Sequence, residues 1–129
     1  MSDIFLAYDI RGKYPEKINE DVAKRIGASL GTLVEQGKVC IGNDIRTSSP
    51  KLNEAVIEGL EATGTDVSSI GTSTTAVCYF QTWTRKMDAG VFVTASHNPP
   101  IYNGFKFMEQ DGTAFLEKLG DLKQIYLGG

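Results

Sequence analysis

The sequence has one histidine, two cysteines and no apolar run that approaches the roughly 20 residues of a membrane-spanning helix. The cysteines, Cys40 and Cys78, have no metal-ligand spacing and no Asp-x-Asp run occurs, so the chain alone offers too few ligands for a metal site. Each cysteine lies in an apolar segment, and we therefore expect two buried thiols rather than a disulfide. No basic region followed by an apolar stretch marks the N-terminus, so no signal peptide is visible and we expect a cytoplasmic protein.

Signatures of several ligand-binding and enzyme classes are also missing. The chain has neither a P-loop nor a Gly-x-Gly-x-x-Gly fingerprint. Ser96 is followed directly by His97, but no Gly-x-Ser-x-Gly elbow surrounds it, and adjacent side chains point apart in extended backbone, which argues against a serine hydrolase. The net charge of −3 and the pI near 5.1 give no general attraction to nucleic acid, so we expect neither nucleic acid nor a membrane as a partner.

The chain does contain apolar runs that alternate with helical patterns over 129 residues, a length typical of one domain. Short apolar runs predict four strands, and apolar residues at helical spacing predict three helices between them. We predict strands over 5–9, 38–42, 66–70 and 90–94, and helices over 19–36, 50–63 and 76–85. The third helical segment has enough β-branched and aromatic residues to support a strand instead. Residues 105–108 are expected to add a short edge strand, and residues 113–126 a last helix.

This order predicts a single α/β domain over residues 1–129. We expect three layers, α/β/α, in which a mostly parallel, mixed sheet of about four strands carries helices on both faces. Capping signals support the helix ends. Asn19 is expected to cap the first helix and Gly37 to end it, and Ser49 and Thr74 are expected to cap the next two.

Polar residues gather where the predicted strands end. In an open parallel sheet, ligands bind outside the carboxyl ends of the strands, and these ends carry cations and hydroxyls beside predicted helix N-termini. Such a surface suits phosphate. The residues in question are Asp9, Arg11, Asp44, Arg46, Ser48, Ser49, Ser73, Thr74, Thr75, Ser96, His97, Asn98 and Lys106.

Each of these residues also has a structural interpretation. Arg11 could close a salt bridge to Asp9 or Glu16, and Arg46 could pair with Asp44 to hold its own loop. The segment Ser96-His97-Asn98-Pro99 could be a polar turn, and Lys106 could simply face solvent. The functional interpretation depends on the joint occurrence of these groups.

Three ordered motifs carry a family resemblance. The segment Thr94-Ala95-Ser96-His97-Asn98-Pro99-Pro100, followed by Tyr102-Asn103-Gly104-Phe105-Lys106, resembles the α-D-phosphohexomutases, the phosphomannomutase/phosphoglucomutase family. Ala7-Tyr8-Asp9-Ile10-Arg11-Gly12 and Gly42-x-Asp44-x-Arg46-x-Ser48 match the same family. The resemblance covers essentially the whole chain but only the first of the four domains of that family.

The resemblance implies roles for single residues. Ser96 resembles the serine that carries the transferable phosphoryl group, and His97 and Asn98 resemble its loop neighbours, which position substrate and phosphoserine. Lys106 and Arg11 resemble the lysine and arginine beside the reacting hydroxyl, where either could help to remove its proton or balance charge.

The resemblance also implies a substrate and a metal. Asn98 and Arg46 fall among the residues expected to bind substrate or phosphate. The reaction implied is reversible transfer of phosphate between C1 and C6 of a hexose phosphate through a hexose 1,6-bisphosphate. Mg²⁺ is expected to bind through the phosphate on Ser96 and an Asp-rich loop of the second domain.

Several family features are absent from this sequence. It has no Asp-x-Asp-x-Asp loop, no sugar-recognition loop and no C-terminal phosphate-clamp motif, and Ala76 stands where the family often has proline. We therefore expect an N-terminal domain that is inactive without domains 2–4 and leaves open which sugar is preferred: mannose, glucose or glucosamine. The alternatives are a stand-alone, non-catalytic phosphosugar- or anion-binding module with the same fold, and an oligomerisation module with incidental polar loops.

Overall fold

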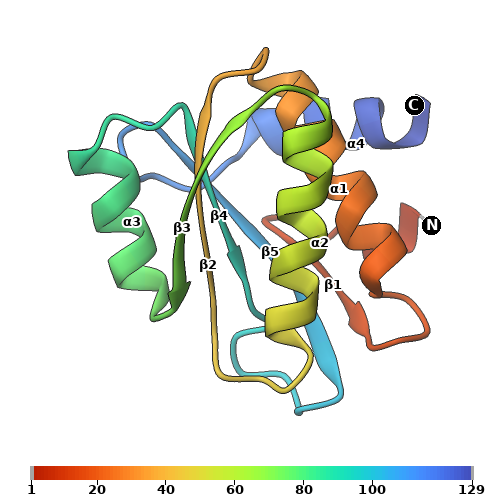
Figure 1. Cartoon of the computed structure of the whole chain (residues 1–129). Coiled ribbons are helices and arrows are strands. Elements are labelled where there is room, and N and C mark those ends of the chain that lie inside the picture. The colour runs from red at the N-terminus through yellow and green to blue at the C-terminus, as the bar shows by residue number, and fades with distance from the viewer. Residues whose placement is uncertain (1, 129) are drawn as a thin grey trace.

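The apolar runs at 38–42 and 90–94 become adjacent inner strands of one five-stranded sheet in the computed structural model, which describes residues 2–128 (Figure 1). The elements in chain order are η1 (Ser2–Ile4), β1 (Ile10–Lys13), α1 (Glu20–Leu33), β2 (Lys38–Asn43), α2 (Ser49–Ala62), β3 (Asp66–Thr72), α3 (Thr75–Thr84), β4 (Ala89–Val93), β5 (Tyr102–Glu109) and α4 (Glu117–Gly128). The strand order is β1-β5-β4-β2-β3. β2 runs parallel to β3 and β4, whereas β5 runs antiparallel to β4 and β1. The mixed, mostly parallel sheet is confirmed, with five strands instead of about four.

Helices cover both faces of the sheet, as predicted. α1, α2 and α4 lie on one face and α3 lies on the other (Figure 1). Because side chains alternate along a strand, the same strands supply two cores. The strands contribute to the larger core Ile10, Val39, Ile41, Ala89, Val91, Val93, Phe105 and Phe107. The smaller core, under α3, holds Cys40, Cys78, Met87, Phe92 and Met108.

The two cysteines are free and buried in the smaller core, which confirms the prediction of buried thiols. A hydrogen bond with Cys40, together with burial, raises the pKa of the Cys78 thiol. Both thiols are therefore part of the packing between β2 and α3.

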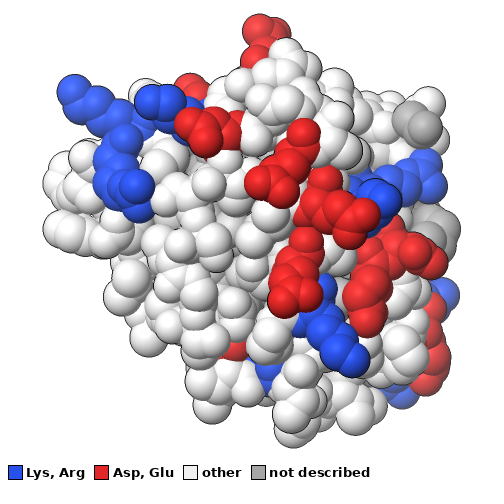
Figure 2. All heavy atoms as spheres, viewed as in Figure 1, with Lys and Arg blue, Asp and Glu red and all other residues white. Residues whose placement is uncertain are grey.

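The two faces of the molecule differ in charge. Acidic side chains gather over α1 and α2, whereas α3 shows an uncharged surface along its length and a group of basic side chains beside its C-terminal end (Figure 2). α3 has no charged residue from Thr75 to Thr84, and its Phe80 and Trp83 are 57% and 59% exposed. No helix between residues 2 and 128 has the length and apolar character needed to cross a membrane.

The first strand lies later than predicted. Residues 5–9 form a turn in which the Leu6 N–H donates to the Asp9 carbonyl at 2.8 Å, and Phe5 makes only an isolated bridge with Ile10. Phe5 packs edge-on against Tyr126 of α4, with ring centroids 5.3 Å apart, instead of entering the sheet. The prediction of a strand over 5–9 was wrong, and β1 pairs with β5 from Ile10 onward.

The ends of α1 are partly as predicted. Asn19 caps the helix, and its side chain accepts from the Val22 N–H at 3.0 Å. The helix ends at Leu33, because Glu35 and Gln36 take φ values of 54° and 59° and turn the chain out of the helix. The left-handed turn is therefore made before Gly37, which does not serve as the predicted stop.

The caps of α2 and α3 differ. Thr74 caps α3 as predicted, accepting from the Val77 N–H at 3.3 Å. The strand alternative for this segment is therefore wrong. Ser49 is not a cap, because it is the first residue of α2 and its hydroxyl donates to Asp44. The cap position belongs to Ser48, whose side chain makes no capping bond.

β5 is an inner strand, not an edge strand, and it is longer than predicted. It lies between β1 and β4 because Phe105 and Phe107 both enter the larger core. Lys106, between them, projects to the opposite face, as strand alternation requires. The last helix starts at Glu117 rather than 113, since Ala114 still bridges Met108 of β5.

Candidate active site

The Ser96 loop, defined here as residues 94–102, joins the carboxyl end of β4 to β5. Ser96 lies three residues beyond the end of β4 and has φ = 53°, a left-handed conformation that is rare for a residue with a side chain. It is half-buried, and its hydroxyl forms no hydrogen bond with any residue from 2 to 128. The loop therefore presents one unengaged hydroxyl on a strained backbone position.

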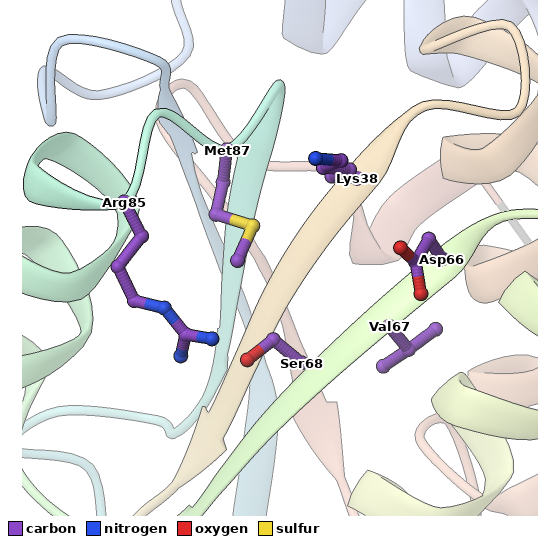
Figure 3. A pocket seen from close by; sticks show the side chains of 6 residues that line it. All are labelled: Lys38, Asp66, Val67, Ser68, Arg85 and Met87. Carbon is purple, nitrogen blue, oxygen red and sulfur yellow. The ribbon is translucent and has the colours of Figure 1, made fainter.

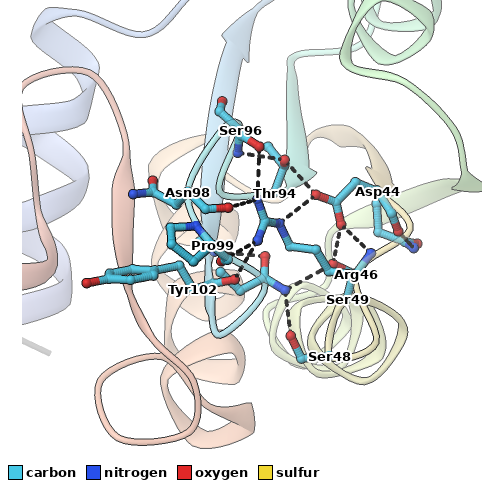
Figure 4. Close-up of polar contacts among 12 residues, drawn as sticks. Asp44, Arg46, Ser48, Ser49, Thr94, Ser96, Asn98, Pro99 and Tyr102 are labelled. Atoms are coloured by element: carbon cyan, nitrogen blue, oxygen red, sulfur yellow. Dashed lines mark hydrogen bonds and ion pairs between the residues drawn. The ribbon is translucent and has the colours of Figure 1, made fainter.

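Two neighbouring side chains tie the start of this loop to β2 (Figure 4). The Thr94 hydroxyl donates to Oδ2 of Asp44 at 2.7 Å and accepts from the Ser96 N–H at 3.0 Å. Asp44, directly after β2, accepts from the hydroxyl of Ser49 as well. The Asn98 N–H closes the turn onto the Ala95 carbonyl at 3.0 Å.

Arg46 lies under the loop and binds its backbone (Figure 4). Its Nη2 donates to the carbonyls of Ser96 and Asn98, both at 2.9 Å. Its Nη1 donates to the carbonyls of Pro99 at 2.8 Å and Tyr102 at 3.2 Å. Its Nε donates to Asp44 Oδ2 at 3.2 Å, and the side chain is 11% exposed. This geometry supports the interpretation in which Arg46 and Asp44 hold the loop.

Arg11 reaches the same loop from β1. It pairs with Asp9, with Nε and Nη2 lying 2.9 Å and 2.7 Å from Oδ2, and not with Glu16. Its Nη1 donates to Oδ1 of Asn98 at 2.7 Å. Asn98 is thus held between two arginines, by its side chain to Arg11 and by its carbonyl to Arg46. Arg11 is 27% exposed and retains one free N–H on Nη1 and one on Nη2.

Two predicted site residues make no polar contact with this group. Lys106 lies on β5 opposite Phe92, is half-buried, and forms no hydrogen bond or ion pair with the part of the chain that the structure describes. His97 is exposed and likewise unengaged within residues 2–128. Both side chains are therefore free to meet a ligand.

Two members of the site were not recognised from the sequence. Thr94 bonds to the N–H two residues ahead, a local pattern open to any threonine, and its link to Asp44 spans 50 residues. The buried amide of Asn103 donates to the hydroxyls of Ser48 at 2.7 Å and Ser49 at 3.0 Å. Asn103 thereby fastens the start of β5 to the first turn of α2. An Asn before a Gly signals a turn, and nothing in the sequence gives its partners.

A metal site is not complete within these residues. Between residues 2 and 128, no three His, Cys, Asp or Glu side chains lie close enough together to hold a metal ion. Mg²⁺ takes about six oxygen ligands, so the Ser96 loop could supply only part of such a shell.

Comparison with known proteins identifies the family. Residues 2–126 match the family model described as "Phosphoglucomutase/phosphomannomutase, alpha/beta/alpha domain I". A phosphomannomutase of Klebsiella pneumoniae is 48% identical over 107 residues, which cover 83% of this chain and 68% of that protein. A protein of Xanthomonas campestris named "Phosphohexose mutases" is 50% identical over 106 residues, 82% of this chain and 24% of that protein.

The fold agrees with these relatives. A crystal structure of a phosphoglucomutase/phosphomannomutase family protein from Burkholderia thailandensis superposes with a TM-score of 0.90 and 37% identity, covering 99% of this chain and 31% of that one. The chain spans about a quarter of the length of the Xanthomonas relative. The motifs, the fold and the matched residues agree, and the chain belongs to the phosphoglucomutase/phosphomannomutase family, of which it forms the alpha/beta/alpha domain I.

Proposed function

We propose that this chain is the phosphoserine domain of a phosphohexomutase, in which Ser96 carries the phosphoryl group that moves between C1 and C6 of a hexose phosphate. One observation carries the proposal. Ser96 presents a free hydroxyl from a left-handed backbone position at the carboxyl end of β4, the end of an α/β sheet where ligands bind. The family membership of the chain and the mutase names of its relatives support the reaction class.

The chemistry balances with one serine. Phosphorylated Ser96 gives its phosphoryl group to the free hydroxyl of a hexose monophosphate, which forms a hexose 1,6-bisphosphate and leaves the serine hydroxyl. The bisphosphate turns over and returns its other phosphoryl group to Ser96, so the enzyme is regenerated. The sugar hydroxyl loses a proton and the leaving oxygen of Ser96 takes one up, so no proton is gained or lost overall. The cationic Lys106 and Arg11 are proposed to favour loss of the sugar proton and to balance the charge that develops.

Cations must offset the charge of the phosphoserine, which is nearly −2 at neutral pH. In our proposal Arg11 offers its two free N–H groups and Lys106 its unpaired ammonium, while His97 and Asn98 position the substrate and the phosphoserine. Mg²⁺ is proposed to add to this balance through the phosphate on Ser96 and through ligands outside residues 1–129. The domain alone is expected to be inactive, and the complete enzyme is proposed to act in the cytoplasm.

The test is site-specific phosphorylation. The complete polypeptide that contains residues 1–129 is incubated with a hexose 1,6-bisphosphate, and the phosphorylated residue is identified by mass spectrometry. We expect phosphate on Ser96, loss of mutase activity in Ser96→Ala, and full activity in Ser68→Ala, a control on β3. Phosphate on another residue together with an active Ser96→Ala variant would refute the proposal. Phosphosugar binding without any phosphorylation would instead favour a non-catalytic binding module.

A further inference from the structure

The contacts of Arg46 are unlike those of an arginine that binds a ligand. A guanidinium group has five N–H donors, and in Arg46 all five are used, one by Asp44 and four by carbonyls of the Ser96 loop. No N–H remains for a phosphate oxygen. We propose that Arg46 is a positioning residue that fixes the direction of the Ser96 side chain, an inference that rests on the proposed role of Ser96.

The peptide group on each side of Ser96 is fixed separately. The peptide group between Ala95 and Ser96 is held at both of its polar atoms. Its N–H, on Ser96, donates to Thr94 Oγ1 at 3.0 Å, and its carbonyl, on Ala95, accepts from the Asn98 N–H at 3.0 Å. In the peptide group between Ser96 and His97, the Ser96 carbonyl accepts from Nη2 of Arg46 at 2.9 Å. Because peptide groups are planar, fixing both of them sets φ and ψ of Ser96 and hence the direction of its Cα–Cβ bond. Only rotation about χ1 is left to the hydroxyl.

The conformation held in this way is one that serine does not choose by itself. A φ of 53° is unfavourable for a residue with a Cβ relative to the ordinary regions. The bonds from Arg46 and Thr94 offset this cost. Without them Ser96 is expected to relax to negative φ, which turns the hydroxyl away from its present direction.

Asp44 anchors both halves of this arrangement. Its carboxylate accepts from Nε of Arg46 at 3.2 Å and from the backbone N–H of Arg46 at 3.0 Å. The same carboxylate accepts from the Thr94 hydroxyl at 2.7 Å, which in turn holds the Ser96 N–H. Asp44 therefore binds both groups that fix Ser96: the Thr94 hydroxyl, which holds the Ser96 N–H, and the Arg46 guanidinium, which holds the Ser96 carbonyl.

The consequence for catalysis is geometric. Phosphoryl transfer needs the accepting and leaving oxygens in line, and a displacement of about 1 Å costs on the order of 100-fold in rate. Loss of Arg46 should therefore slow the transfer step while leaving the affinity for a hexose phosphate nearly unchanged. An arginine that bound the phosphate directly would show the opposite pattern.

The test compares Arg46→Lys, Thr94→Val and the control Arg85→Lys in the complete polypeptide. We measure the single-turnover rate of Ser96 phosphorylation by a hexose 1,6-bisphosphate, the dissociation constant for a hexose monophosphate, and amide deuterium exchange in residues 94–102.

Lysine has three donors on a point charge and cannot replace the five of Arg46, so for Arg46→Lys we expect a rate loss of about 100-fold with a change in affinity below about threefold. Thr94→Val keeps the shape and should lose about tenfold. In both variants the amide hydrogens of the Ser96 loop should exchange faster than in the unmodified protein. The control Arg85→Lys, at the end of α3, should match the unmodified protein in all three measurements.

The outcomes separate the two proposals. If Arg46→Lys weakens hexose phosphate binding tenfold or more and leaves the saturated rate unchanged, Arg46 binds substrate and the inference is overturned. Unchanged rate and unchanged exchange in both site variants overturn it as well. If the unmodified protein is never phosphorylated on Ser96, the proposed function fails. The exchange data then still decide whether Arg46 and Thr94 hold the loop.

Discussion

Each end of the sheet has an arginine and a lysine, but the two pairs are used differently. Near the carboxyl ends of β2 and β4, Arg46 is 11% exposed and bound to four loop carbonyls, and Lys106 is half-buried. At the amino ends of β2 and β3, Lys38 and Arg85 line a hollow of about 320 Å³ with Asp66, Ser68 and Met87 (Figure 3). Both of those cations are exposed, and Arg85 extends from the end of α3 toward β3.

The difference shows that a hollow with cations does not by itself make a site. The basic groups beside the hollow stand on flexible stems in water, where holding them against an anion costs side-chain entropy. At the other end, hydrogen bonds between distant segments fix the backbone around one free hydroxyl before any ligand arrives. Such preorganisation is what transfer chemistry requires, whereas the size of a cavity is not.

The largest effect is expected where β1 and β5 approach each other beside Arg11. A Cβ on Gly104 would lie 2.0 Å from the Ile10 carbonyl oxygen and 3.0 Å from the Arg11 Cα, both backbone atoms. Gly104→Ala must therefore push β1 away, at a cost of about 3 kcal/mol or more, and move Arg11 off Asn98. Urea unfolding would measure the loss of stability, and a mutase assay would measure the loss of activity.

A second glycine is the matched control for this change. Gly120 on α4 has no atom within 4 Å of an added Cβ, so Gly120→Ala should gain about 0.5–1 kcal/mol from helix propensity and keep full activity. Equal stability changes in the two variants would contradict the close approach of β1 and β5.

The next effect compares one lysine from each end of the sheet. Lys106→Met removes an unpaired ammonium that we propose faces the phosphoryl group, and we expect mutase activity to fall about 100-fold or more with little change in unfolding free energy. Lys38→Met, at the hollow, should leave activity within about twofold, because exposed charges far from a site act weakly through solvent. Steady-state kinetics of both variants test this. Equal losses would mean that the hollow matters to activity as much as the surface beside the Ser96 loop.

Much of the fold could be predicted from the sequence because its signals are local. Asn19 and Thr74 cap helices with side chains that bond three residues ahead, and short apolar runs predicted the strands β2 and β4. The position of β1 could not be predicted, because Phe5 packs on Tyr126, far along the chain. The place of β5 inside the sheet also depends on pairing with β1 and β4, which no local pattern encodes.

The site shows the same division between local and distant signals. Motif resemblance singled out Ser96, Arg11 and Lys106, and the Asp44–Arg46 pair was foreseen from its spacing. Thr94 and Asn103 were not, since their partners lie 50 to 55 residues away in sequence. In our proposal the left-handed backbone of Ser96 is held by Arg46 and Thr94, so residue type alone gives no sign of it.

The smallest effect contrasts a tyrosine beside the Ser96 loop with one on α4. Tyr14, whose N–H donates to the Ile101 carbonyl at 2.7 Å, gives its hydroxyl to Glu20 at 3.0 Å. The hydroxyl of Tyr126 is buried with no partner among residues 2–128, and burial raises its pKa. Tyr14→Phe should therefore lose about 1 kcal/mol of unfolding free energy at pH 7, and Tyr126→Phe should gain about as much.

The dependence on pH tests the Tyr126 side of this contrast. A raised pKa in the folded protein means that, above about pH 10, the unfolded chain releases the Tyr126 proton while the folded chain keeps it. The unfolded state then binds fewer protons, so stability falls as the pH rises, and Tyr126→Phe should remove this part of the fall. Urea unfolding of the unmodified protein and of Tyr126→Phe, at neutral and alkaline pH, measures this fall in stability. Parallel curves would show that the Tyr126 hydroxyl is hydrated in the folded protein.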